Sequence, residues 1–194
     1  MEDKIKYIIP MIILSLVLLS CSKEEEEEET DTTTELEGTW KTACYTNSDN
    51  TSSITTLTFA GNVITGKDEK HSDTSCATDY SLEEETLTFS IVDAVTFANG
   101  KTGHKFTVTV GSTEKITPQS ASAVSALNSE SKCSASDWEL NTEKECSTGD
   151  YAGDTKLCLY QLDGNNWYSK CDNSAYPSTS DIQTDNASST FVKQ

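Results

Sequence analysis

The sequence predicts an all-β protein, a barrel or a sandwich built from many short strands. Apolar residues recur at every second position in several runs, which is the period of a half-buried strand. Turn residues separate these runs. Six cysteines follow residue 35, an even number that suits a small exported domain held by disulfides.

Three segments carry the strand prediction. Apolar side chains alternate with Thr or Ser in residues 55–59, 87–91 and 106–110. Gly61-Asn62 predicts a two-residue turn into a further strand at 63–65. We expect these runs to place six side chains inside the fold, as core residues or as the wall of a ligand-binding site: Leu57, Phe59, Leu87, Phe89, Phe106 and Val108.

One helix is expected within this β-rich pattern. Between Pro118 and Ser129, the apolar residues Ala123, Val124, Ala126 and Leu127 fall near one side of a short helix. The hydroxyl of Ser120 is a suitable N-cap for it. This single helix leaves the all-β prediction unchanged.

Composition narrows the functional classes. The chain has 194 residues, room for one domain with a core, and a formal net charge of −18. It contains no Arg, so the bidentate recognition of phosphate that Arg provides is missing. We therefore expect no nucleic-acid partner, because each phosphate contact would begin against electrostatic repulsion.

The N-terminal segment has the layout of a secretory signal peptide. Two lysines precede an apolar run from Tyr7 to Leu19, which is too short for a membrane-spanning helix. Residues 18–21 (Leu-Leu-Ser-Cys) resemble the bacterial lipobox, whose cysteine is acylated, for example with palmitate. This resemblance implies a lipoprotein signal peptide at 1–20 and a lipidated N-terminus at Cys21. An ordinary signal peptide with a chance cysteine is the alternative.

The residues after Cys21 predict an acidic tether. Six consecutive glutamates, Glu24–Glu29, repel one another and have no apolar face, so segment 21–35 is expected to be a solvated spacer. Residues 22–25 (Ser-Lys-Glu-Glu) resemble a signal that places some lipoproteins on the outer face of the outer membrane. We expect a bacterial cell-envelope protein anchored through Cys21, with the membrane leaflet left open.

One disulfide follows from strand register. A hairpin turning at Gly164-Asn165 places Leu162 opposite Trp167 and Cys158 opposite Cys171. The two cysteines then form a non-hydrogen-bonded pair, close enough for a disulfide. A zinc site is the competing interpretation of the cysteines, but the chain has no C-x-x-C spacing and its histidines lie far from them.

A more specific pattern runs through the first half of the expected domain. Gly38-Thr39-Trp40, Cys44, Leu57-Thr58-Phe59 and the segment 71–76 ending at Cys76 resemble lipocalin-like domains of bacterial exported proteins. They are also similar to the domain of the secreted Wnt inhibitor named for down-regulation by the adenomatosis polyposis coli protein. His71 stands where that pattern more often has an aromatic residue.

This resemblance covers most of residues 36–194 and implies an antiparallel up-and-down β-barrel of about eight to ten strands. It implies a bond between Cys44 and Cys76, which leaves Cys133 and Cys146 as the remaining pair. It also implies that the first and last strands pair, so that Lys193 either covers the Trp40 ring or stays solvated.

No catalytic motif stands out. The chain lacks a nucleophile elbow, a zinc-protease helix and a nucleotide loop. We expect His71 and His104 to be surface residues, and the acidic runs 68–69 and 83–85 to be solvated loop residues rather than a glycosidase pair. Segment 149–154 resembles a calcium loop without the EF-hand spacing, and we predict no metal site.

Together these features predict a non-enzymatic, lipid-anchored envelope protein whose barrel binds a small hydrophobic ligand and needs no cofactor. The alternative is a structural or protein-interaction lipoprotein with a filled barrel or sandwich. Neither the ligand nor a protein partner can be named from the sequence.

Overall fold

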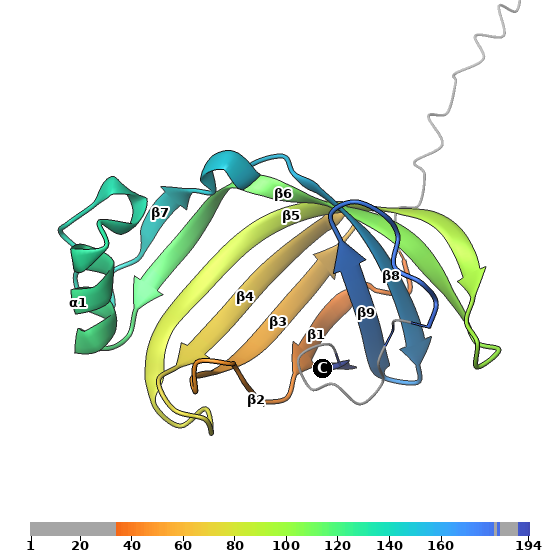
Figure 1. The fold of residues 1–194 in the computed structure, drawn as a ribbon, viewed down its shortest axis with the longest axis horizontal. Coiled ribbons are helices and arrows are strands. Elements are labelled where there is room, and N and C mark those ends of the chain that lie inside the picture. Colours follow the sequence, from red (N-terminus) through yellow and green to blue (C-terminus); the bar gives the residue numbers. More distant parts are fainter. Residues whose placement is uncertain (1–33, 181, 183–189) are drawn as a thin grey trace, which may run out of the picture. The chain divides into compact units, whose positions relative to one another are not determined.

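The computed structural model describes residues 34–180, 182 and 190–194. Cys21, the predicted signal peptide and nearly all of the predicted acidic tether lie outside these residues. The helical elements are α1 (Ala121–Ser129) and two single-turn 3₁₀ helices, η1 (Lys132–Ser134) and η2 (Gly149–Tyr151). The strands, shown in Figure 1, are β1 (Gly38–Thr42), β2 (Tyr45–Thr46), β3 (Ser52–Ala60), β4 (Val63–His71), β5 (Asp79–Thr96), β6 (Thr102–Pro118), β7 (Lys144–Ser147), β8 (Thr155–Asp163), β9 (Asn166–Asp172) and β10 (Thr190–Lys193).

Eight of these strands close into an antiparallel barrel. Their order is β1-β10-β9-β8-β6-β5-β4-β3, and β3 pairs with β1 to complete the circle. Two short strands lie outside it, β2 beside β3 and β7 beside β6. Closure removes the free edges that an open sheet would leave. The predicted all-β, lipocalin-like barrel with one short helix is confirmed.

The predicted turns form where the residues require them. The β3/β4 turn places Gly61 at φ 60°, and the β8/β9 turn places Gly164 at the same angle, a backbone region that glycine enters without steric cost. In the second hairpin Cys158 lies opposite Cys171, with 4.1 Å between their Cα atoms. The register predicted from the sequence, and the disulfide that it implied, are confirmed.

The other two disulfides are Cys44–Cys76 and Cys133–Cys146, the pairs expected from the family resemblance. Cys44–Cys76 joins the β1/β2 connection to the β4/β5 connection. Cys133–Cys146 lies in the insertion between β6 and β8.

The longest strands, β5 and β6, bend sharply, and the bend shapes the barrel interior (Figure 1). Their register shifts between Glu85 and Leu87. At this point a Cβ on Gly111 would lie 2.2 Å from the carbonyl oxygen of Thr86, so only glycine allows the two backbones to approach. The bend separates a half of β6 that pairs with β8 from a half that pairs with β7.

Part of the barrel is filled by aromatic side chains. Trp40 is fully buried, donates a 2.6 Å hydrogen bond from its indole nitrogen to the Leu36 carbonyl, and lies under the Lys193 ammonium, 5.1 Å from the ring centroid. Of the two alternatives left open for Lys193, the structure has the one in which its ammonium covers the Trp40 ring. The buried aromatic residues of this plug are Trp40, Phe59, Phe89, Phe106, Tyr160, Trp167 and Phe191.

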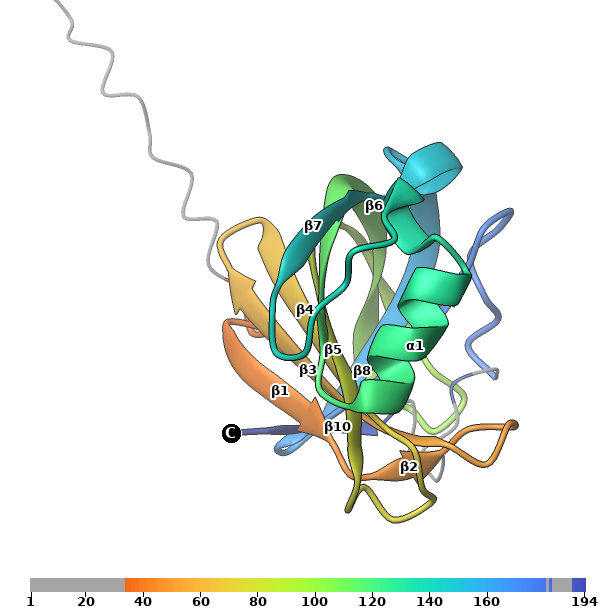
Figure 2. The ribbon, with the colours of Figure 1, turned by 90° about the vertical axis from the view of Figure 1, so that its left-hand side faces the viewer.

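A second, smaller core lies where β5 and β6 extend past the barrel. Helix α1, which Figure 2 shows in front of these strands, packs with the insertion against Ile116, Trp138 and Cys146. The Ser120 hydroxyl caps α1 by accepting a 3.1 Å hydrogen bond from the Ala123 amide, as predicted. The Cys133–Cys146 disulfide ties this insertion to the barrel strands through β7.

The expectation that His71 is a surface residue is wrong. Strand β4 continues as far as His71, which pairs with Ser52 of β3, and the residue is only 7% exposed. Its Nδ1 lies 3.3 Å from a carboxylate oxygen of Asp79. His104 is partly exposed and stacks on the Tyr160 ring.

Candidate functional site

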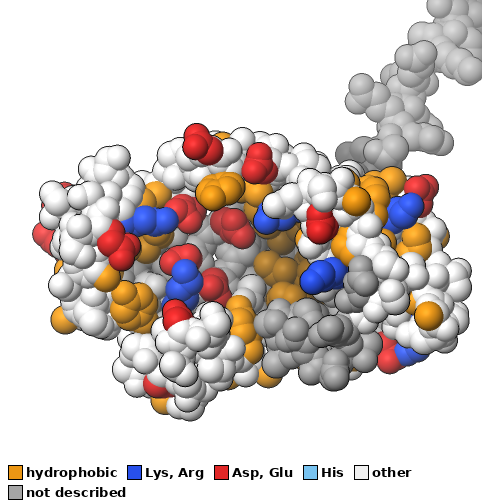
Figure 3. Space-filling model, in the orientation of Figure 1, with side chains coloured by type: hydrophobic (Ala, Val, Ile, Leu, Met, Phe, Trp, Pro, Cys, Tyr) orange, Lys and Arg blue, Asp and Glu red, His pale blue; other side chains and the backbone are white. Residues whose placement is uncertain are grey.

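The barrel contains a cavity of about 840 Å³, within the size range of small-molecule sites. Figure 3 shows a hollow in the face of the molecule, with acidic and basic side chains around it. Strands β3 to β6 and β8 to β10 contribute to its wall, together with the insertion that contains η1 and η2. The apolar residues of the wall include Leu57, Ile64, Leu87, Phe106, Val108, Val110, Trp167 and Phe191.

The structure divides the six residues predicted to face the interior. Leu57, Leu87, Phe106 and Val108 line the cavity. Phe59 and Phe89 do not line it and lie deeper in the aromatic plug, where their rings meet edge to face at 5.2 Å, whereas Phe106 belongs to both the plug and the wall. The first four are thus the candidate ligand contacts, and the last two support them from behind.

Polarity changes along the barrel axis, row by row. Residues opposite one another in neighbouring strands share a face, so the register defines rows across β3, β4, β5 and β6. The row at the plug is apolar: Phe59, Ile64, Leu87 and Val110. The next is mixed: Leu57, Gly66, Glu85 and Glu114. The row beyond it contains Thr55, Asp68, Glu83 and Ile116.

Three of the four carboxylates in these rows have partners. Lys132 of η1 approaches Glu114 at 3.0 Å, and Thr55 donates a 3.1 Å hydrogen bond to Asp68. Glu83 forms a 2.6 Å ion pair with Lys70. Such pairing stabilises charge in a partly enclosed site, because each carboxylate keeps a counterion or a donor.

Glu85 is the exception. Within the described part of the chain, no hydrogen bond or ion pair involves its carboxylate. Burial within the concave wall raises the pKa of the Glu85 carboxyl, and the nearby negative charge of Glu114 raises it further. The side chain still has solvent contact through the open cavity. Lys156 attracts the Glu85 carboxylate less strongly than Glu114 repels it, so Glu85 is exposed, has no direct partner and is only partly compensated.

Gly66 makes room for this carboxylate. It lies between Leu57 and Glu85 in the mixed row. A Cβ at position 66 would sit 3.2 Å from Cγ of Glu85 and 3.5 Å from a methyl carbon of Leu57. Because Gly66 has no side chain, the Glu85 side chain can pack over the β4 backbone at this position, and the space beside it stays part of the cavity.

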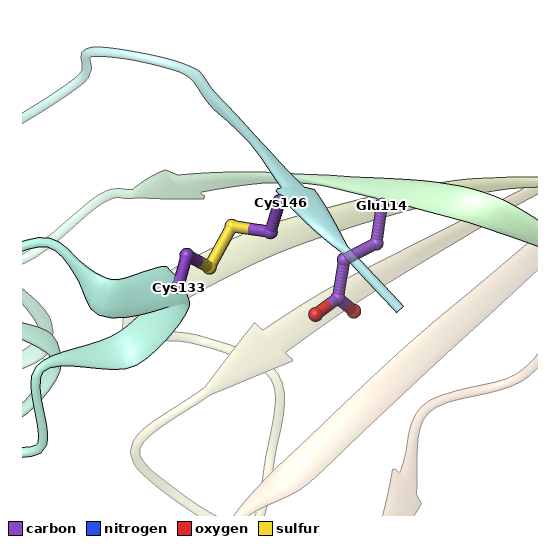
Figure 4. Close-up of side chains that lie close together, drawn as sticks. All are labelled: Glu114, Cys133 and Cys146. Carbon is purple, nitrogen blue, oxygen red and sulfur yellow. A yellow bond between two sulfur atoms is a disulfide. The ribbon is translucent and has the colours of Figure 1, made fainter. Parts of the chain in front are cut away.

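The insertion between β6 and β8 forms the polar rim. Asp150, Tyr151 and Asp154 lie at the cavity wall around η2, and Tyr151 is 71% exposed. Figure 4 shows Glu114 near the Cys133–Cys146 disulfide. A carboxylate oxygen of Glu114 lies within 4.8 Å of both sulfurs. The two sulfurs are bonded to each other, so neither is a thiolate that could bind a metal with Glu114.

Sequence reasoning missed the main polar residue of this site. We expected residues 83–85 to be solvated loop residues, and this is wrong because all three lie in β5. Residues 68–69 likewise lie in β4. The strand could have been recognised from its period of two, because one face of β5 carries Ser81, Glu83, Glu85, Leu87 and Phe89. The apolar alternation is visible only from Leu87 onward, since the glutamates before it are charged.

The fold and cavity together define a lipocalin-like β-barrel with an internal cavity that is apolar on one side and carboxylate-rich on the other. No protein-family model matches the chain, and comparison with curated proteins found no match. Over the residues that the structure describes, no helix has the length and hydropathy needed to cross a membrane.

Proposed function

We propose that this protein is a non-enzymatic, lipid-anchored protein of the bacterial cell envelope whose barrel binds a small hydrophobic ligand. The observation that carries the proposal is the cavity of about 840 Å³, whose inner wall is formed by aliphatic and aromatic side chains. Barrels of eight strands are wide enough either to be filled by side chains or to hold one small ligand. Here the aromatic plug fills part of the barrel, and three of its members, Phe106, Trp167 and Phe191, also line the cavity beside it.

Ligand binding is tested first on protein purified without detergent. Organic extraction followed by mass spectrometry should recover a hydrophobic small molecule in about molar proportion to the protein. A preparation extracted and refolded with its disulfides intact should then bind an added apolar probe at one saturable site. Failure of both experiments would refute the ligand-binding proposal.

The lipid anchor rests on the sequence alone, because Cys21 lies outside the described residues. Two acyl chains or more give stable membrane attachment, whereas one chain gives only reversible binding. Cys21→Ser should therefore move the exported protein from the membrane fraction to the soluble fraction. If the variant stays fully membrane-bound, the lipobox assignment is wrong.

A structural or interaction protein is the second candidate, and the aromatic plug favours it. Seven buried aromatic side chains rigidify part of the barrel without any ligand. On this hypothesis no small molecule co-purifies, and the rim loops around η2 bind another protein. The extraction experiment separates the two candidates directly.

A further inference from the structure

The charged groups of the cavity wall are mostly acidic. Glu85, Glu114, Asp150 and Asp154 line it, against Lys132 and Lys156. The whole chain carries a formal charge of −18, so the field outside the barrel also attracts cations. A ligand entering the cavity therefore meets negative potential before it reaches the apolar wall.

Of the four wall carboxylates, only Glu114 has an ion pair within the described residues, and Glu85 is the unpaired one that borders the apolar part of the wall. Lys132 is already 3.0 Å from Glu114. Lys156 lies on β8 opposite Val108, is exposed, and forms no ion pair within the described residues, although its charge attracts Glu85 less strongly than Glu114 repels it. Glu85 faces the cavity with no hydrogen bond or ion pair in that part of the chain, one row away from the apolar residues Leu87 and Ile64.

This arrangement suits an amphiphilic molecule, with one apolar end and one cationic end. Leu87, Phe106, Val108 and Trp167 offer an apolar surface, and Glu85 lies at its border. A carboxylate in a concave, partly desolvated wall binds an ammonium group more strongly than it would in open water. An anionic head group at the same place would face Glu85 and Glu114 and would be repelled.

We propose that the ligand is a cationic amphiphile, whose apolar chain lies along Leu87, Phe106 and Val108 and whose protonated amine binds the carboxylate of Glu85. This inference rests on the proposed ligand-binding function and adds the chemical class of the head group. Gly66 leaves space for the amine beside Glu85, which a Cβ at position 66 would narrow.

Three probes with one chain length test the head group: decylammonium, decanol and decanoate. Each is titrated at neutral pH, below the concentration at which it self-associates, and binding is followed by tryptophan fluorescence and calorimetry. Trp167 lines the cavity, so its emission should respond. We expect decylammonium to bind about tenfold more tightly than decanol, and decanoate to bind most weakly, as a hydrogen bond to a charged group implies.

Two matched variants locate the effect. Glu85→Gln should reduce decylammonium affinity to about that of decanol, with decanol affinity unchanged. Glu84→Gln removes the same charge from the neighbouring residue of β5, whose side chain points to the opposite face, and should leave all three affinities unchanged. Added salt should weaken binding of decylammonium but not of decanol.

The outcomes separate the two proposals. If none of the three probes binds, the ligand-binding function itself fails. If decanol or decanoate binds as tightly as decylammonium in the wild-type protein, the barrel binds apolar ligands but the cationic head group is wrong. Equal losses in Glu84→Gln and Glu85→Gln would also overturn the assignment to Glu85. The wild-type comparison stands even if a variant folds poorly.

Discussion

Truncation of Phe59 and of Leu87 should have different costs, because one residue belongs to the plug and the other to the cavity wall. Phe59 is 1% exposed and meets the rings of Phe89 and Trp167 edge to face at 5.2 and 5.3 Å. Removing such a ring creates a closed void. We expect Phe59→Ala to lower the free energy of unfolding by about 3–5 kcal/mol.

Leu87 lies on the same face of the sheet, in the same row as Phe59, but one side of it faces the cavity. The contacts that Leu87→Ala removes are therefore fewer, and the new space joins a cavity that already exists. At roughly 0.8 kcal/mol for each buried carbon removed, with three carbons lost and more than about two thirds of the residue buried, the expected loss is about 2 kcal/mol.

Urea unfolding with the disulfides intact, followed by circular dichroism, measures both variants against the wild-type protein. Equal slopes would show that the midpoints report stability. A cost for Leu87→Ala as large as that for Phe59→Ala would refute the reasoning, since it would mean that the barrel is packed throughout.

Two further predictions concern a disulfide and a titrating residue. Replacing both Cys158 and Cys171 by Ala opens a loop with a sequence separation of 13 residues, and should lower the free energy of unfolding by about 3 kcal/mol in urea titrations; an unchanged midpoint would contradict a stabilising role. Burial and Glu114 raise the pKa of Glu85 in the folded state, so the folded protein holds this proton to higher pH than the unfolded chain does. Its stability contribution therefore falls as pH rises from the unfolded pKa through the folded pKa. Glu85→Gln should be more stable than the wild type at neutral pH, with the difference vanishing at acidic pH; a variant less stable at neutral pH would show that Glu85 has a stabilising partner.

The fold was largely predictable because its determinants are local. Alternation marked β3, β5 and β6, and the Gly-Asn turn fixed the pairing that joins Cys158 to Cys171. Two-residue turns and period-two patterns act over a few residues, so one sequence is enough to read them. The pairing of the first strand, β1, with the last, β10, came only from the family resemblance.

The candidate site was less predictable because it depends on long-range register. The sequence indicated Leu57 and Phe106 as interior residues, but could not show that Phe59 belongs to the plug. Glu85 faces the interior only because β5 runs without a break from Asp79 to Thr96. A run of three glutamates favoured a solvated loop, and tertiary pairing with β4 and β6 overrode that preference.

The central claim is that the open part of the barrel binds a hydrophobic molecule, and decanol binding to a cavity-filling variant tests it most directly. Leu87→Trp places a large ring in the cavity, whereas Thr88→Trp adds the same ring to the exposed, outward face of β5. Calorimetry should give one decanol site in the wild-type protein and in Thr88→Trp, and none in Leu87→Trp. Absence of a saturable site in the wild type, or full binding by Leu87→Trp, would contradict the account.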